Sequence, residues 1–310
     1  DEPRLDSGLA RAVFERRPRL KVTDIEAWGE CPFKFYVKRF LDLKERECAG
    51  LDVMKLGSVR HGALEKIYNE LQQDGILHWG RIDLDRADAL IDEHLAEMRR
   101  EELKRALRAG RMQELTLETL ATDLKLAVRA MRLAAQNGEV AQCSAEWQFG
   151  RDGELTVEVD GLNIAITGKV DRIDCCRDAS GRAAFFLYDY KSGKRMFSLT
   201  RLFGGVDMQL FSYALALLAT AGERRPSAIA DRPRLGGVFY WPLTAPLLDG
   251  EADADAGDEV VVAAWFEKCR PFGIFATDLA ERLDASITPG GPGSPAWRFK
   301  LTNKGELNRS

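Results

Sequence analysis

The chain has 310 residues, and its 45% hydrophobic and 30% charged residues are typical of a globular protein with a core of its own. Its 45 basic and 49 acidic residues give a net charge of −4, so a nucleic-acid-binding function would depend on local patches rather than overall charge. No apolar run reaches the about 18 residues of a membrane span, so no membrane partner is expected. Six cysteines without a CxxC pair favour reduced thiols and a cytoplasmic location.

Residues 1–20 are rich in arginine and contain two prolines, and we expect an irregular lead-in or linker there. Because the first residue is Asp1, we expect the chain to be a piece of a longer polypeptide. Residues 21–310 are expected to form a single domain. Thr23 and Glu26 form a capping-box pattern that predicts a helix, which Pro32 should break or kink.

Two further helical regions precede the predicted strands. The first runs from about 58 to 73 and ends before Gly75. The second is a helical insertion at about 83–137, divided into two helices near Gly110. Its many charged residues are typical of a solvated helical hairpin.

The pattern then changes to alternating apolar and polar residues. The turn Asp160-Gly161 predicts a hairpin, whose second strand continues to about Cys175. The remaining expected elements are a strand at 184–190, a helix at 207–218, strands at 236–241 and 260–265 around a flexible loop at about 244–259, and a helix at 272–286. This order predicts a mixed α/β fold with a helical insertion before the sheet.

Two aspartates and a lysine lie near the ends of neighbouring predicted strands. Asp189 and Lys191 share one face of their strand, because the side-chain period is two, and Asp171 can meet Asp189 if the strands pair antiparallel. Two carboxylates beside an ammonium suit a hard divalent cation. The alternative is a surface salt bridge, which the short triplet alone favours. The apolar flank at 185–187 favours the metal site, because unpaired buried charge is costly.

His61 and a glutamine–tyrosine pair could complete such a site. His61 is either a further metal ligand or a partly exposed histidine paired with Glu65, one helical turn away. Gln209 and Tyr213 are four residues apart on a predicted helix. They could support a metal ligand, contact a DNA phosphate, or form a polar stripe at the edge of a core helix.

Five segments, in this order, resemble the PD-(D/E)xK nucleases, in particular the RecB-like exonuclease branch with its AddB/RecB-type nuclease domains. The similarity covers residues 20–245. Each motif is short, and the ordered set carries the resemblance. The segments are residues 22–36 with Cys-Pro-Phe, 57–65 with Gly57 and His61, 168–174 with Asp171, 189–193 with Lys191, and 209–213 with Gln209 and Tyr213.

The resemblance implies a restriction-endonuclease-like core, which is a mixed β-sheet flanked by helices. It implies that Mg²⁺ or Mn²⁺ is bound by Asp171 and Asp189, with help from His61 and the backbone carbonyl of Tyr190. Lys191 would position or activate the water that hydrolyses a DNA phosphodiester. The resemblance further assigns a supporting role to Gln209 and Tyr213.

The implied function is a metal-dependent DNA exonuclease module of a repair or recombination protein, fused to or associated with a helicase-like protein. For DNA binding we single out the basic residues Lys194, Arg195 and Arg201, because no acidic residue lies between Lys191 and Val206. The alternative is a catalytically silent, nuclease-like module that binds DNA or scaffolds a partner. Retention of both aspartates and the lysine argues against that alternative. A third possibility, an unrelated α/β protein in which these residues form a salt bridge, would leave the ordered set of five motifs as coincidence.

Some relatives of this kind carry an iron–sulfur cluster held by a cysteine of the Cys-Pro-Phe motif and three cysteines near the C-terminus. Cys31 fits the first position, but no cysteine follows Cys269. Because an ordinary cluster needs four thiolates, we expect no iron–sulfur cluster.

Overall fold

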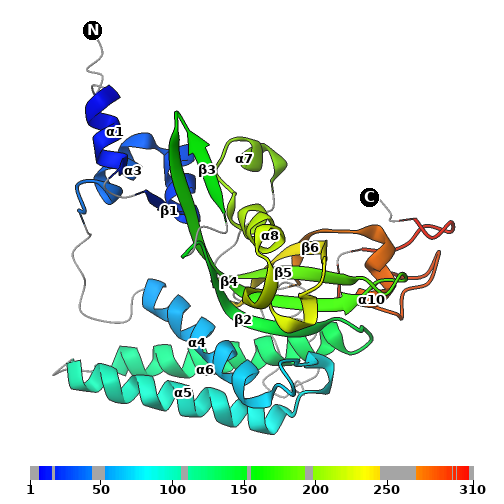
Figure 1. Ribbon diagram of the computed structural model, residues 1–310. Helices are drawn as coiled ribbons and strands as arrows, with labels where there is room; N and C mark the ends of the chain where they lie inside the picture. Colours follow the sequence, from blue (N-terminus) through cyan, green and yellow to red (C-terminus); the bar gives the residue numbers. More distant parts are fainter. Residues whose placement is uncertain are drawn as a thin grey trace. The chain divides into compact units, whose positions relative to one another are not determined.

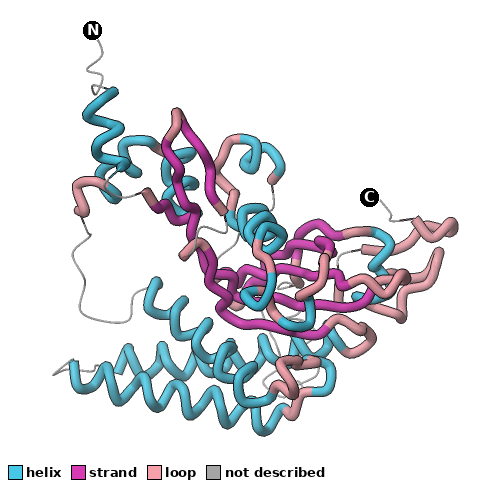
Figure 2. Tube along the Cα trace, viewed as in Figure 1, coloured by secondary structure: helices cyan, strands magenta, loops and turns pink. Residues whose placement is uncertain are grey.

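Within the residues that the structure describes, a mixed sheet of seven strands organises the computed structural model (Figures 1 and 2). Its order is β1-β4-β5-β6-β7, and β2 and β3 also pair with β4. The strands are β1 Arg19–Lys21, β2 Ala141–Phe149, β3 Thr156–Val159, β4 Leu162–Arg177, β5 Ala183–Lys191, β6 Arg234–Pro242 and β7 Phe272–Phe275. The structure describes residues 7–15, 18–43, 53–105, 111–151, 155–192, 198–244, 270–294, 296–297 and 299–306.

Helices precede the sheet and separate its strands. They are α1 Ser7–Glu15, α2 Val22–Glu30, α3 Pro32–Arg39, α4 Val53–Leu71, α5 Leu84–Arg105, α6 Arg111–Ala135, α7 Leu199–Phe203, α8 Gln209–Ala219 and α10 Ala280–Leu283. Within the described ranges, no helix has both the length and the apolar character needed to cross a membrane.

The chain divides into two compact units. Unit 1 comprises Asp1–Glu47, Trp147–Val170 and Phe197–Arg225. Unit 2 comprises Cys48–Glu146, Asp171–Met196 and Pro226–Ser310.

In unit 1, β1 runs parallel to β4, and β3 runs antiparallel to it. The predicted hairpin turn is confirmed: Asp160 and Gly161 have φ angles of 49° and 73°, the two positive values that a type I′ turn requires. The expected break at Pro32 is also confirmed, because α2 ends at Glu30 and Pro32 begins α3, where its missing N–H is tolerated. Glu26 accepts hydrogen bonds from the N–H groups of Met208 and Gln209 at the start of α8.

In unit 2, β5 is the central strand. It pairs antiparallel with β4 and parallel with β6, and β7 runs antiparallel to β6. Every residue of β5 from Ala183 to Tyr190 is buried, which explains its nearly continuous apolar run. The charged residues Asp189 and Lys191 come at the end of this buried strand.

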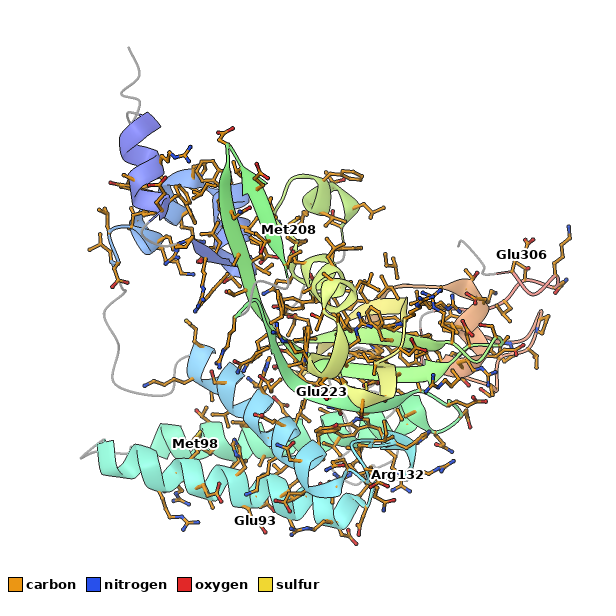
Figure 3. All side chains as sticks on the ribbon, in the orientation of Figure 1. Glu93, Met98, Arg132, Met208, Glu223 and Glu306 are labelled. Atoms are coloured by element: carbon orange, nitrogen blue, oxygen red, sulfur yellow. The ribbon has the colours of Figure 1, made fainter. Side chains whose placement is uncertain are left out.

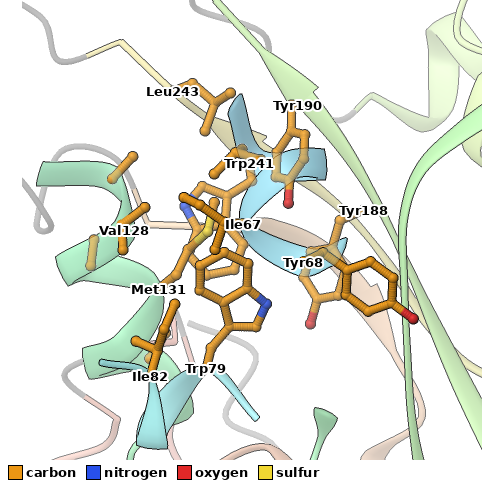
Figure 4. Packing of buried hydrophobic residues seen from close by; sticks show 14 of the residues in the cluster. Ile67, Tyr68, Trp79, Ile82, Val128, Met131, Tyr188, Tyr190, Trp241 and Leu243 are labelled. Atoms are coloured by element: carbon orange, nitrogen blue, oxygen red, sulfur yellow. The ribbon is translucent and has the colours of Figure 1, made fainter. Parts of the chain in front are cut away.

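The core of unit 2 joins the helices to the sheet. Ile67 of α4, Val128 and Met131 of α6, and Tyr188 and Trp241 of the sheet belong to one buried cluster (Figure 4). The charged residues of the helices lie outside this cluster, as on α5, where Glu93 (labelled in Figure 3) pairs with Lys66 at 3.5 Å.

A buried ion pair lies among the aromatic residues of this core. Arg172 and Asp174 form two hydrogen bonds of 2.7 and 2.6 Å, and both are almost fully buried. The guanidinium carbon lies 5.0, 4.8 and 5.4 Å from the ring centres of Trp79, Tyr188 and Trp241, so aromatic faces as well as the carboxylate compensate for its lost hydration.

Four expectations differ from the structure. Residues 7–15 form helix α1 where an irregular lead-in was expected. Residues 272–275 form a strand, and only 280–283 are α-helical, so the helix expected at 272–286 is wrong. The sequence of β7, Phe-Gly-Ile-Phe, favours a strand over a helix, and β7 pairs with β6. The expected solvated hairpin at 83–137 instead buries an apolar side in the core of unit 2. Strands β1 and β2 were not predicted. The strand expected at 260–265 and nearly all of the loop expected at 244–259 lie outside the described residues.

Candidate metal centre

The end of β5 and the adjoining part of β4 hold the two predicted aspartates. The antiparallel register pairs Arg172 with Tyr188, and its continuation by one residue sets Asp171 opposite Asp189. The N–H of Tyr190 donates a hydrogen bond of 2.7 Å to Oδ2 of Asp171, which fixes that carboxylate. Both aspartates are buried, at 7% and 3% exposure, so their charges need compensation nearby.

His61 approaches this carboxylate from helix α4. Its Nδ1 lies 3.2 Å from Oδ1 of Asp171 and 3.4 Å from Oε1 of Glu146. The imidazole ring also packs edge-on against Tyr190, with 5.6 Å between ring centres. The carboxylates that face His61 therefore come from β4 and β2, not from Glu65 on its own helix.

Glu146 is the site residue that the sequence analysis missed. It lies in β2 with a φ of 51°, in the left-handed region that few residues other than glycine adopt. Ligand atoms of His61, Glu146 and Asp171 all lie within 4.8 Å of one another. The only sequence signal for Glu146 was an acidic residue in the mostly apolar segment 141–149. Its position close to His61 depends on strand pairing in the sheet, which the sequence does not show.

The charges of this cluster are strongly coupled. Burial lowers the pKa of His61, but hydrogen bonds and charges from Asp171 and Glu146 outweigh burial and raise the pKa to about 10. Burial, together with the charge of Asp171, raises the pKa of Asp189 to about 6, although Lys191 acts in the opposite direction. Without a metal, the proton on His61 therefore supplies the positive charge between two carboxylates.

The donor set fits a divalent cation. One imidazole nitrogen and two carboxylate groups are suitable ligands for Mn²⁺, and the carboxylates suit Mg²⁺. A cation could replace the proton of His61 as the counter-charge, because the same three groups face one another. The fit rests on the chemistry and spacing of these side chains.

Lys191 is held beside the cluster by contacts at the end of β5. Its ammonium forms an ion pair with Asp189 and lies 5.6 Å from the ring centre of Tyr240. Its carbonyl accepts a hydrogen bond of 2.8 Å from the N–H of Leu243. These contacts fix the strand end that carries the lysine.

Arg60 links the histidine helix to the segment after Lys191. It is 7% exposed, forms an ion pair of 3.6 Å with Asp123 of α6 and contacts Ser192 Oγ at 3.5 Å. Burial lowers the pKa of Arg60, and Asp123 opposes that change. Arg60 thus connects α4, α6 and the end of β5.

The other predicted residues belong to unit 1 or lie outside the described part of the chain. Gln209 and Tyr213 are buried on α8, and the Tyr213 ring packs edge-on against Phe149 at 5.7 Å. Arg201 forms an ion pair of 2.9 Å with Asp207. Lys194 and Arg195 lie outside the described residues, and the roles of all five stay predictions.

Comparisons with a family model and with known proteins agree on the family. The family described as the PD-(D/E)XK nuclease superfamily matches residues 19–290. A protein of Moorella thermoacetica, named as a subunit of an ATP-dependent helicase/deoxyribonuclease, is 29% identical over 252 residues, 79% of this chain and 21% of the relative. Proteins of the same name from Clostridium botulinum (strain Okra / Type B1) and Acetivibrio thermocellus are 27% and 29% identical over 88% and 86% of this chain, and 24% and 23% of their own lengths.

The chain thus spans about a fifth to a quarter of the length of these relatives. The family match covers most of the chain, including both strands of the aspartate pair and the helix that carries His61. The mixed sheet with flanking helices is the restriction-endonuclease-like architecture that the resemblance implied. The chain belongs to the PD-(D/E)XK nuclease superfamily, in its RecB-like branch.

Proposed function

We propose that this chain is a metal-dependent DNA nuclease module that hydrolyses phosphodiester bonds. The observation that carries the proposal is the convergence of His61, Glu146 and Asp171 within 4.8 Å, beside the Asp189–Lys191 ion pair. A structural salt bridge alone would not require an additional histidine and a glutamate in the left-handed backbone region.

His61, Glu146 and Asp171 would hold the ion, with Asp189 and the carbonyl of Tyr190 as further ligands. A bound Mg²⁺ or Mn²⁺ would polarise a phosphoryl oxygen and lower the pKa of water. Tyr190 orients Asp171 through its N–H, and Asp189 orients Lys191 through their ion pair. The ammonium of Lys191 would offset the negative charge that develops on the phosphate or position the attacking water.

We further propose that the module acts on DNA ends and works as part of a helicase-containing protein. The relatives' name joins helicase and deoxyribonuclease, and the chain matches only part of each relative. On this view Gln209 and Tyr213 support the site, and Lys194, Arg195 and Arg201 contact DNA phosphates. An exonuclease needs a DNA end, so closed circular DNA should not be cleaved.

The test is cleavage of end-labelled linear DNA and closed circular DNA with Mg²⁺, Mn²⁺ or chelator. We expect metal-dependent loss of the linear DNA alone. Lys191→Ala should abolish this loss. Lys66→Ala, which removes a half-buried lysine of α4 that pairs with Glu93 and Glu97, should retain it. Cleavage in chelator, or by Lys191→Ala, would refute the proposal. No cleavage with any metal would favour the catalytically silent DNA-binding module.

A further inference from the structure

Unit 1 contains a pocket of about 560 Å³, whose lining includes the proposed supporting residue Tyr213 but none of the proposed metal ligands and not Lys191. This volume lies within the range of roughly 300–1,000 Å³ found for sites that bind small ligands or parts of larger ones. The pocket is bounded by β1, the first turn of α2, the end of β2 and the middle of β4. Its lining residues all lie in unit 1.

The lining is strongly basic. Five cationic side chains and a single carboxylate, Asp24, contribute to it. The carboxylate is 7% exposed and is already engaged, because it accepts a hydrogen bond from the N–H of Lys21 and lies 3.7 Å from Arg39. The basic residues are Arg19, Lys21, Arg39, Arg151 and Lys169, and all but the partly buried Arg39 are exposed.

Several of these cations are oriented by the local backbone. Arg19 donates to the carbonyl of Arg151 at 3.2 Å, and Arg39 donates to the carbonyl of Arg19. Arg151 donates to the side chain of Gln148 at 2.7 Å. Strands β1 and β4 set Lys21 and Thr167 side by side, in register. The positive charge is thus arranged around one concavity by paired strands.

The floor of the pocket is apolar and firmly packed. The rings of Phe149 and Tyr213 line it, and both are almost completely buried. A Cβ at Gly168 would lie 2.6 Å from the Phe149 ring and 2.9 Å from the Tyr213 ring, so glycine permits this close packing. A pocket with a firmly packed apolar base and several basic side chains around it is better suited to an elongated anion than to a compact apolar ligand.

We propose that this pocket is a phosphate-binding subsite that holds the backbone of a single DNA strand. It rests on the proposed function for the identity of the ligand as DNA. Basic grooves that follow the backbone are the usual means of binding single strands. A flexible strand can bend its phosphates into a concavity, whereas bending a duplex, with a persistence length of about 50 nm, costs free energy. This surface differs from the residues 194, 195 and 201 predicted from sequence.

The test is the binding of a fluorescein-labelled oligo(dT) strand to the whole chain in chelator, measured by anisotropy over a range of salt concentrations. The pocket variant combines Lys21→Gln, Arg151→Gln and Lys169→Gln. The matched control removes three exposed basic residues of unit 1 outside the pocket, with Arg11→Gln, Lys34→Gln and Lys38→Gln. Thermal unfolding checks that both remain folded, and Lys169→Gln alone provides a milder variant.

We expect the pocket variant to lose at least about tenfold in affinity, and its slope of log affinity against log salt to fall by about 2, since each phosphate contact contributes about 0.7 for a single strand. The control should change much less, and blunt duplex should show a smaller difference between the variants. Equal loss in both triple variants, or unchanged binding in Lys169→Gln and the pocket variant, would overturn the proposal.

This result is independent of catalysis. Binding is measured in chelator, so pocket-dependent binding without metal-dependent cleavage would refute the proposed function and retain the subsite. Cleavage without pocket-dependent binding would refute the subsite and retain the proposed function.

Discussion

In the proposed metal centre, a proton on His61 and a metal ion would compete for the same position between Asp171 and Glu146. Because the pKa of His61 is raised to about 10 in the metal-free protein, metal binding must release a proton at neutral pH. The raised pKa also means that His61 stabilises the metal-free fold below its ordinary pKa of 6.5, and that this stabilisation is lost as the pH rises towards 10.

The apparent affinity for Mn²⁺ should therefore increase with pH, by about tenfold per unit while one proton is released. Below about pH 6, protonation of Asp189 should make the dependence steeper. Calorimetric titration with Mn²⁺ at several pH values checks this. The dependence should flatten in His61→Asn, and an affinity that does not change with pH in the wild type would contradict this account.

Glu146 provides a second test at the scale of a residue. Glu146→Gln should weaken Mn²⁺ binding by at least about tenfold and reduce cleavage, because it removes a charged ligand from the cluster. Glu65→Gln on α4 is the matched control: it makes the same chemical change one helical turn from His61 and should have little effect. Equal Mn²⁺ affinities for the two variants would exclude Glu146 from the site.

The sequence singled out His61, Asp171, Asp189 and Lys191 as candidates because each lies in a short pattern with its own chemistry, and their roles stay predictions. Glu146 has no such pattern. Its place beside His61 depends on β2 pairing with β4 and on an unusual φ angle, and neither can be inferred from neighbours in the sequence. Long-range pairing and local backbone strain are the features that single-sequence reasoning could not supply.

At the scale of elements, helix α6 shows how charge concealed a core-forming segment. Its charged residues suggested solvent exposure, but Leu120, Leu124 and Val128 are buried against the rest of unit 2. These residues recur at intervals of four, which is the periodicity of a helix with one buried side. The helix thus supports α4, which carries His61.

Leu124→Ala should lower the free energy of unfolding by about 2–5 kcal/mol, because it leaves a cavity in a packed core. Leu115→Ala is a matched control on the same helix, since Leu115 is 49% exposed, and should change stability by no more than about 0.5 kcal/mol. Chemical denaturation measures both. Equal, small effects would show that α6 does not belong to the core.

The strands also show which elements can be predicted from local sequence and which cannot. The hairpin at Asp160-Gly161 and strands β4 to β6 were predicted, because turn chemistry and apolar runs are local signals. Strand β1, with three residues, is too short to show a period. Residues 272–275 pair antiparallel with β6, and this partner is distant in the sequence.

At the scale of the whole molecule, we expect residues 1–310 by themselves to bind no iron–sulfur cluster. No cysteine follows Cys269 within this sequence, and an ordinary cluster needs four thiolates. Protein purified without oxygen should contain no stoichiometric iron or acid-labile sulfide. A brown protein with both elements present would require other cysteines as ligands.

The central claim assigns metal binding and catalysis to neighbouring but different side chains of unit 2. The most direct test measures Mn²⁺ binding and cleavage of linear DNA on the same preparations of wild type, Asp171→Asn and Lys191→Ala. We predict that Asp171→Asn loses both properties, whereas Lys191→Ala binds Mn²⁺ with nearly the wild-type affinity and does not cleave. Wild-type binding and cleavage by Asp171→Asn, or cleavage by Lys191→Ala, would contradict the assignment.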